Sequence, residues 1–297
     1  MSQLLEILGS KYPIIQGPIG ELNDPKMVAA ISEAGAFGLL ALGFVTDLDQ
    51  VKQVIAQIKD LTDKPFGANL MIAMNPKNEA ILELLAEAGV KTVTTSAGAP
   101  KKIYPKIKAL GLKGLHVTLA ASMAVKAAEA GTDGVIVSGT ESGGLRTTGP
   151  ETTNLILIPL VCDLVQIPVV AAGGICDRRG YRAALALGAQ GVQLGTAFLA
   201  SEESPASQAW KEAIISCGEP GTLRLPVGGM AMRTLINPKL AGLLASGADL
   251  TKEYNLMNAG QAWRSGDFDL FPAGGGQVSA LIKAIKPVKD IIQEMVS

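Results

Sequence analysis

Two glycine turns late in the chain are the segments best suited to chemistry. Gly173 and Gly174 follow the short apolar run Pro168–Ala172, and Gly195 follows a second run, Gly191–Leu194. Glycine lets backbone N–H groups approach an anion because no Cβ stands in the way. Two such turns on adjacent parallel strands, each leading into a helix, can cradle a phosphate. We therefore predict a phosphate site here; the alternative is that these glycines only shape tight turns.

The elements that position these turns alternate between short apolar strands and helices. Eight strands are expected, at Pro13–Gln16, Phe37–Ala41, Pro65–Asn69, Val90–Thr95, Leu112–Val117, Gly134–Ser138, Pro168–Ala172 and Gly191–Leu194. Eight strand–helix units predict an α/β fold, a (β/α)8 TIM barrel, in which the last two loops are the usual phosphate site. A doubly wound open sheet is the alternative. The absence of G-x-G-x-x-G after the first strand argues against a dinucleotide-binding sheet.

The pattern changes after the eighth strand. Residues 1–200 are assigned to the barrel, and residues 201–270 are interpreted as a helical lid over its mouth. Residues 271–297 are predicted to form a glycine-rich turn and an amphipathic helix that returns to close the barrel. Within the lid, Gly218–Gly229 is rich in turn residues and Met230–Asn237 matches no single pattern. The alternative is that these helices form a dimer contact.

Composition excludes several classes of protein. The net charge of the 297 residues is −1, so no basic surface predicts binding to nucleic acid or to a membrane. The most apolar stretch, Leu155–Ala172, is interrupted by two prolines and by polar residues, which argues against a membrane span. With one histidine, we expect no metal site. The three cysteines, Cys162, Cys176 and Cys217, show no C-x-x-C spacing, and no signal peptide precedes them, so a cytoplasmic location is expected.

Several short motifs occur along almost the whole chain. They are PIIQGP at residues 13–18, KPFGAN at 64–69, TTSAG at 94–98, ESGG at 141–144, AAGGI at 171–175, QLGT at 193–196 and the turn at 273–279. Together these motifs resemble those of the FMN-dependent nitronate monooxygenases, also called 2-nitropropane dioxygenases, and of the FMN-dependent enoyl-acyl-carrier-protein reductases. The full set of motifs is specific to this family, whereas any one motif alone would be weak evidence for it.

The resemblance implies a bound FMN. The residues that would hold its phosphate are Gly173, Gly174, Gly195 and Thr196. Asn69 would bond to the edge of the flavin ring, and Gln277 would close the site from the lid; the alternatives are a turn cap and a helix cap. Gly143 and Gly144 would pass close to the ring, where a side chain would collide. The other residues implied to line the cofactor are Gln16, Gly17, Pro18, Ile19, Thr95, Ala172 and Gln193.

One position departs from the family pattern. In the family, the Gly-Gly of the sixth strand-to-helix loop is followed by a catalytic histidine, but here Gly144 is followed by Leu145. Leucine cannot transfer a proton. The resemblance therefore implies FMN binding and leaves the specific activity open, and the loop at 145–151 is expected to carry the specificity of a distinct subgroup.

Three residues are candidates for the missing role. His116 is expected near the end of the fifth strand, with a pKa suited to proton transfer; the alternative is an imidazole held in the barrel wall or touching the flavin. Arg146 could clamp a carboxylate or phosphate, or be a solvated loop arginine. Glu141 could act as an acid if buried, or could bond to the backbone of the sixth loop or to a flavin hydroxyl.

Three classes of function compete. The first is an FMN-dependent oxidoreductase, with electrons from NAD(P)H or from substrate, which includes enoyl-acyl-carrier-protein reductase activity. The second is a phosphosugar aldolase or isomerase, which needs a lysine or paired carboxylates at strand ends; no strand here ends in lysine. The third is a non-catalytic flavin-binding protein. We predict the first, acting on a small or acyl-type substrate as a cytoplasmic homodimer.

Overall fold

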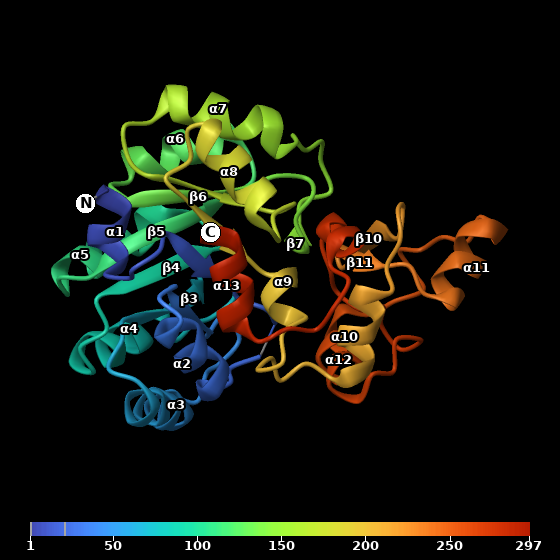
Figure 1. Ribbon diagram of the computed structural model, residues 1–297, viewed down its shortest axis with the longest axis horizontal. Coiled ribbons are helices and arrows are strands. Elements are labelled where there is room, and N and C mark those ends of the chain that lie inside the picture. The colour runs from blue at the N-terminus through green and yellow to red at the C-terminus, as the bar shows by residue number, and fades with distance from the viewer. Residues whose placement is uncertain (1, 21) are drawn as a thin grey trace.

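The computed structural model describes residues 2–20 and 22–297, and its larger part is a closed parallel barrel (Figure 1). The barrel strands are β1 (Ile14–Gln16), β2 (Gly38–Ala41), β3 (Phe66–Met71), β4 (Thr92–Ser96), β5 (Lys113–Thr118), β6 (Gly134–Ser138), β8 (Val169–Ala172) and β9 (Gly191–Leu194). Their order in the sheet is β1-β9-β8-β6-β5-β4-β3-β2. This topology confirms the predicted TIM barrel, and all eight predicted strands are present.

Helices form an outer layer around the strands (Figure 1). They are α2 (Pro25–Glu33), α3 (Leu48–Leu61), α4 (Asn78–Glu87), α5 (Tyr104–Ala109) with the 3-10 turn η1 (Pro100–Lys102), α6 (Ala121–Glu129), α7 (Asn154–Leu164), α8 (Arg178–Ala186) and the short α9 (Thr196–Leu199). The last helix, α13 (Val288–Val296), buries Val288, Ile292 and Met295 in the same core cluster as Ile14 and Ile31. The segment from residue 278 is not one continuous helix: a 3-10 turn, η3 (Gln277–Leu281), precedes α13.

The strands are apolar because both of their faces are covered. Ile15, Leu39, Leu115 and Ile136 fill the barrel interior, and the alternate residues pack against the helices. The first helix, α1 (Gln3–Leu8), contributes Leu4, Ile7 and Leu8 to the interior cluster, so it plugs the bottom of the barrel. The opposite end, where the strands terminate, is therefore the mouth.

The segment at residues 201–270, for which the name lid is kept while its covering of the mouth stays a prediction, contains a small sheet as well as helices. Its helical elements are α10 (Gln208–Ile215), α11 (Pro238–Ser246), η2 (Leu256–Asn258) and α12 (Ala259–Ser265). Residues predicted as turn-rich or ambiguous instead form a hairpin, β10 (Thr222–Val227) and β11 (Met230–Leu235), joined by Gly228 and Gly229 at positive φ. The third strand of this sheet, β7 (Gly144–Arg146), comes from the sixth barrel loop and pairs with β11.

The barrel closes at a seam between β1 and β2, where two side chains make hydrogen bonds to β2 that backbone groups make elsewhere in the sheet. The strands share a single bridge, between Ile15 and Phe37. Beyond it, Gln16 Oε1 accepts the N–H of Leu39 at 2.9 Å. Asn23 then pairs with Ala41 twice: Oδ1 accepts the N–H at 2.6 Å, and Nδ2 donates to the carbonyl at 2.8 Å. A side-chain amide has the donor and acceptor of a peptide unit, so it can complete the ladder.

None of the described helices combines the length and the apolar character needed to cross a membrane.

We expect Asn23→Ala to lower the free energy of unfolding by about 2–3 kcal/mol, because it leaves the buried N–H and carbonyl of Ala41 without partners. Urea denaturation of the purified protein measures this loss. Asn258→Ala is the matched control, since Asn258 makes no capping hydrogen bond with its side chain. Equal stability of the two variants would refute the assigned role of Asn23.

Candidate functional site

Polar side chains gather at the mouth on β3 and β4. Asn69 lies between Ala68 and Leu70, which pack against the outer helices, so its amide faces the barrel interior. Asn69 Nδ2 donates to Thr94 Oγ1 at 2.9 Å, and Ser96 Oγ donates to Asn69 Oδ1 at 3.3 Å. Asn69 is therefore fixed by its neighbouring strand and does not cap the next turn. Its contact with a flavin remains a prediction.

The two glycine turns differ in the space around them. Gly173 and Gly174 have φ of 97° and 73°, which favours glycine, and a Cβ on Gly173 would lie 2.0 Å from Ser142 Oγ. A Cβ on Gly195 would meet no atom within 4 Å. Because β8 and β9 are neighbours, the open space at Gly195 lies beside the Gly173–Gly174 turn. Glycine at these turns leaves the backbone N–H groups uncovered, as an anion site requires, and binding of a phosphate here stays a prediction.

The first barrel loop runs against the second glycine turn. The N–H of Gly17 donates to Leu194 O at 2.8 Å, and a Cβ on Gly17 would lie 3.1 Å from Gly195 Cα. Ile19 packs against the buried cluster that contains Trp210 and Ile214. The side-chain oxygen of Gln16 is engaged in the barrel seam, and the contact of this residue with a flavin stays a prediction. Of the remaining predicted lining residues, Pro18 is half-buried, and Gln193 is buried with Nε2 3.5 Å from Gln16 O.

The sixth loop packs against the glycine-rich turn near the C-terminus. A Cβ on Gly143 would lie 3.0 Å from Gly276 N, whereas one on Gly144 would meet nothing within 4 Å. The N–H of Gln277 donates to Glu141 O at 2.9 Å, and its side chain is exposed. The N–H of Gly276 donates to Thr196 Oγ1 at 3.0 Å. A side chain at position 143 would therefore collide with this turn, whereas the sequence predicted a collision with the flavin ring.

Leu145, which stands where the resemblance implies a histidine, faces the lid. In the β7–β11 pair, Leu145 lies opposite Met232. Its side chain packs on the lid core formed with Leu225, Tyr254 and Phe271. Leu145 thus anchors the sixth loop to the lid and contributes no proton-transfer group to the mouth.

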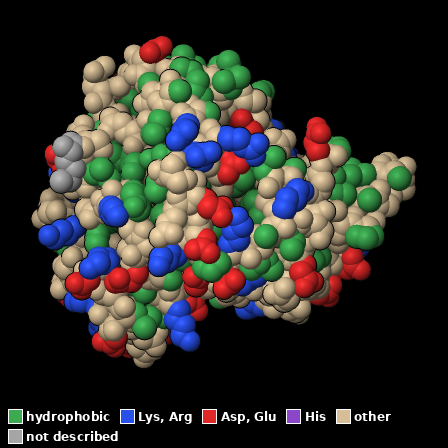
Figure 2. Space-filling view, in the orientation of Figure 1, with side chains coloured by type: hydrophobic (Ala, Val, Ile, Leu, Met, Phe, Trp, Pro, Cys, Tyr) green, Lys and Arg blue, Asp and Glu red, His purple; other side chains and the backbone are tan. Residues whose placement is uncertain are grey.

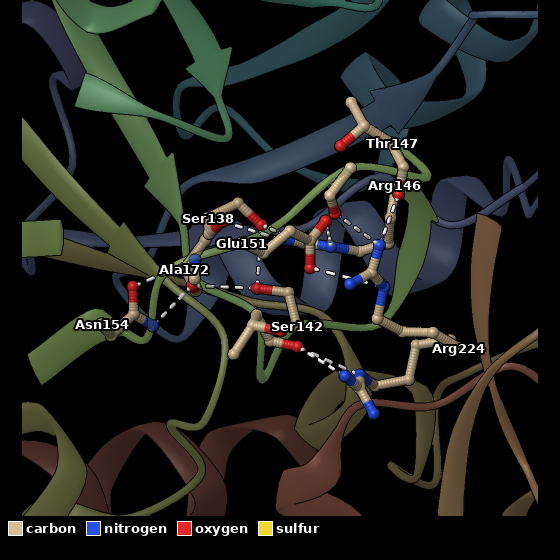
Figure 3. Close-up of polar contacts among 12 residues, drawn as sticks. Ser138, Ser142, Arg146, Thr147, Glu151, Asn154, Ala172 and Arg224 are labelled. Carbon is tan, nitrogen blue, oxygen red and sulfur yellow. Dashed lines mark hydrogen bonds and ion pairs between the residues drawn. The ribbon is translucent and has the colours of Figure 1, made fainter. Parts of the chain in front are cut away.

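Arg146 is buried in an ion pair, contrary to both predictions for it. Its Nε donates to Glu151 Oε1 at 2.9 Å, and the two side chains are 1% and 2% exposed. Nη1 and Nη2 donate to Ser138 Oγ and Ser138 O at 2.9 and 3.0 Å (Figure 3). The guanidinium is thus neither solvated nor placed to clamp a substrate. It fixes the loop to the end of β6.

Glu141 caps a helix rather than acting as an acid. Its Oε1 and Oε2 accept the N–H of Asn154, the first residue of α7, at 2.9 and 3.2 Å. A carboxylate at this end of a helix is stabilised by the helix dipole. The alternative predicted for Glu141, a bond to the backbone of the sixth loop, is nearly met, because the bonded N–H belongs to Asn154, the residue that follows this loop. Asn154 Nδ2 in turn donates to the carbonyls of Ala172 and Gly173, at 2.8 and 2.7 Å.

Two lid arginines were missed by the sequence analysis. Arg224 and Arg233 lie opposite each other in the hairpin, although like charges at such a pair of positions repel. Arg233 Nε and Nη2 donate to Thr140 O at 3.1 and 2.8 Å, and Arg224 Nη2 donates to the carbonyls of Thr147 and Gly149 at 2.6 and 3.0 Å. Burial, and then the charge of Arg146, lower the pKa of Arg233. The sequence feature that could have revealed these two residues is an arginine in each of the apolar segments that flank Gly228-Gly229.

His116 and Thr95 lie in the barrel wall, not at the mouth. Thr95 Oγ1 is 2.7 Å from His116 Nδ1 and 3.2 Å from the hydroxyl of Tyr104 on α5. His116 is 5% exposed, and burial lowers its pKa to about 4. Successive residues of a strand face opposite sides, and Leu115 points inward, so His116 points outward. The structure thus corrects the mouth position expected for His116 and the flavin contact expected for Thr95.

The described residues contain no group of three or more histidine, cysteine, aspartate or glutamate side chains placed to hold a metal ion.

Comparison with known proteins identifies relatives that cover most or all of this chain. The sequence model of the nitronate monooxygenase family matches residues 1–297. A (3aS,4S,5R,7aS)-5-hydroxy-7a-methyl-1-oxo-octahydro-1H-indene-4-carboxyl-CoA dehydrogenase of Rhodococcus jostii is 38% identical, over 82% of this chain and 68% of its own. A probable nitronate monooxygenase of Staphylococcus saprophyticus is 34% identical, over 73% of each chain. The structure of FabK from Thermotoga maritima has a TM-score of 0.88 and 33% identity, covering 100% of this chain and 95% of that one.

We expect the stability of the protein to depend on pH through His116. Its pKa falls from 6.5 in the unfolded chain to about 4 in the fold, so only the unfolded chain gains a proton between these values. Stability is complete above pH 6.5 and falls by up to about 3 kcal/mol as the pH drops toward 4. His116→Asn should flatten this part of the urea-denaturation profile and retain the flavin. An unchanged profile, or loss of flavin from a folded variant, would contradict the wall position.

We expect Glu151→Gln to destabilise the protein by about 3–5 kcal/mol, because it leaves the buried guanidinium of Arg146 without a counter-charge. The double variant Arg146→Met with Glu151→Leu should lose less than the sum of its single variants. Glu294→Gln is the control, since the Lys286–Glu294 pair is exposed and should contribute less than about 1 kcal/mol. Additive losses in the double variant would show that the pair is not coupled.

Proposed function

The chain belongs to the nitronate monooxygenase family of flavin-dependent oxidoreductases, and from this premise we propose that its flavin is FMN, bound across the barrel mouth. Electrons come from NAD(P)H or directly from the substrate, and the substrate is a small or acyl-type molecule. We also propose that the protein works in the cytoplasm, in keeping with its three free cysteines.

The paired turns of β8 and β9 carry the proposal of a mononucleotide. Two left-handed glycines, Gly173 and Gly174, stand beside a third glycine, Gly195, whose missing side chain leaves open space. This is the position at which TIM barrels bind a terminal phosphate. The phosphate is a group that FMN has at its end and riboflavin lacks, so these turns favour the mononucleotide.

The remaining mouth residues would orient the ligand without transferring protons. The inward side chains at the strand ends are amides and hydroxyls, including those of Asn69, Thr94, Ser96, Ser138 and Gln193. When bound, FMN supplies the redox chemistry, accepting electrons from a donor and passing them to an acceptor. A hydride transfer needs no protein base, so Leu145 is compatible with a redox function. A substrate that must first lose a proton is a poor match to this mouth.

Two alternative functions rest on specific observations. The likeness to FabK over the whole chain favours an NAD(P)H-dependent reductase of the enoyl-acyl-carrier-protein type. Leu145 in place of the family histidine favours a flavin-binding protein without catalysis. Anaerobic bleaching of the bound flavin by NADH or NADPH would exclude the non-catalytic alternative. Reoxidation by an enoyl thioester, compared with reoxidation by oxygen and a nitronate, would then separate the two enzyme classes.

We expect Gly195→Asp to weaken FMN binding at least 100-fold, about 2.8 kcal/mol, because its carboxylate would fill the space beside the phosphate turn. Gly195 has ordinary backbone geometry and no neighbour for a Cβ, so the melting temperature of the flavin-free protein should change little. Titration of flavin-free protein with FMN, followed by flavin fluorescence, measures the affinity.

Gly242→Asp is the matched control for this experiment, since a Cβ at that exposed position of α11 also meets no atom within 4 Å. It should bind FMN as the parent protein does. Unchanged FMN affinity in Gly195→Asp would place the phosphate elsewhere. A parent protein that is colourless and takes up no added FMN would overturn the cofactor proposal altogether.

A further inference from the structure

The proposed phosphate site depends on backbone groups, because its two turns carry no cation. Residues 171–176 and 193–198 contain neither lysine nor arginine. Lysine and arginine side chains are interspersed with aspartate and glutamate on the face shown in Figure 2, and the net charge is −1, so the surface supplies no strongly positive field. Backbone N–H groups are then the donors left for a phosphate, and the direction in which they point decides how well it is held.

Asn154, the first residue of α7, uses its whole side-chain amide to bind backbone at the ends of β6 and β8. Nδ2 donates to Ala172 O at 2.8 Å and to Gly173 O at 2.7 Å, and Oδ1 accepts the N–H of Gly139 at 3.0 Å. The residue is 8% exposed, and its own N–H donates to Glu141. Figure 3 shows Asn154 reaching Ala172 at the end of β8. Both N–H groups of the amide are therefore committed to the first glycine turn.

These two bonds decide which way the peptide groups of the turn face. The carbonyl of Ala172 shares a peptide group with the N–H of Gly173, and the carbonyl of Gly173 shares one with the N–H of Gly174. Neither peptide bond is cis, and in a trans peptide group the N–H points opposite to the C=O. Because both carbonyls point toward α7, the two N–H groups point away from it. The other neighbour of β8 is β9, which ends at Gly195.

A Gly-Gly pair needs such a restraint more than other sequences do. Glycine adopts positive and negative φ about equally well, so the peptide group between Gly173 and Gly174 can flip at little cost. A flip would turn the carbonyl oxygen of Gly173 toward the phosphate, and the negative end of its dipole would repel that group. Ser142 Oγ also donates to Ala172 O, at 3.0 Å, but the peptide group that can flip is held at Gly173 O by Asn154.

We propose that Asn154 is a positioning residue for the phosphate site: it holds the carbonyls of the first glycine turn so that the N–H groups of this turn face the phosphate of FMN. The inference rests on the proposed function, in which that phosphate lies at Gly173 and Gly174. Asn154 does not itself bind the phosphate, because both of its N–H groups already donate to carbonyls. Its effect is on the selectivity for the phosphorylated flavin, and the affinity for the flavin ring is independent of it.

The test compares FMN with riboflavin, which has the same ring system and no phosphate. Flavin-free protein is titrated with each ligand, and the ratio of the two dissociation constants measures what the phosphate contributes. The parent protein should bind FMN about 100-fold more tightly than riboflavin. In Asn154→Ala this ratio should fall about tenfold, with the affinity for riboflavin nearly unchanged. A merely structural role would weaken both ligands alike and leave the ratio as it is.

Asn78→Ala is the matched control for this experiment. Asn78 is the first residue of α4, is 6% exposed, and donates from Nδ2 to Met71 O and Ile72 O at 3.1 and 3.2 Å. It thus holds two successive carbonyls after β3 as Asn154 does after β8, but at a loop where no phosphate is proposed. This variant should lose stability as Asn154→Ala does and keep the ratio of the parent protein.

Asn154→Ser covers the case in which Asn154→Ala does not fold, because serine keeps one hydroxyl that can donate a hydrogen bond. Its ratio should fall about threefold, since one donor replaces two. A folded variant of Asn154 that keeps the ratio of the parent protein would overturn the positioning role and leave the phosphate site in place. A parent protein that binds FMN and riboflavin equally would instead remove the phosphate site of the proposed function, and this inference with it.

Discussion

The arrangement of the mouth depends on the ion pair buried between Arg146 and Glu151. Two charges removed from water cost several kcal/mol each unless their hydrogen-bonding groups are satisfied. The guanidinium meets this demand with Glu151 and with both oxygens of Ser138. The Ser138 hydroxyl donates to Ser142 Oγ at 2.8 Å, and Ser142 donates to Ala172 O at 3.0 Å, directly before the first glycine turn. One polar network therefore fixes the sixth loop and the turn of β8 (Figure 3).

The barrel was predictable from sequence because its signals are local. Each buried strand is a short apolar run, and each glycine turn follows such a run directly, as at Gly173 and Gly195. The hairpin of the lid was not predictable in the same way. Arginines at 224 and 233 interrupt its apolar pattern, and they are accommodated only because carbonyl oxygens of the sixth loop, distant in sequence, accept hydrogen bonds from them. Tertiary contacts override the local pattern there.

In the candidate site, too, local backbone features were predictable from sequence and features set by tertiary contacts were not. Backbone features such as the turns at Gly174 and Gly195 were located from sequence, since glycine spacing reports backbone geometry. Side-chain roles were not, because they depend on which way a residue points. His116 was expected at the mouth, but the alternation of β5 turns it outward, toward Thr95 and Tyr104. Polar residues near a strand end can face either side, and the sequence of one strand does not reveal which.

The strand that the sixth loop lends to the lid has a consequence for how this protein can be altered. The lid sheet is assembled from residues 144–146 and 222–235, which are separated by the last two strands of the barrel. The lid is therefore not a cassette that recombination can exchange as one contiguous gene segment. A chimera that takes the lid of a relative must also take that relative's sixth loop. A substitution in either of these segments limits which substitutions the other segment can accept.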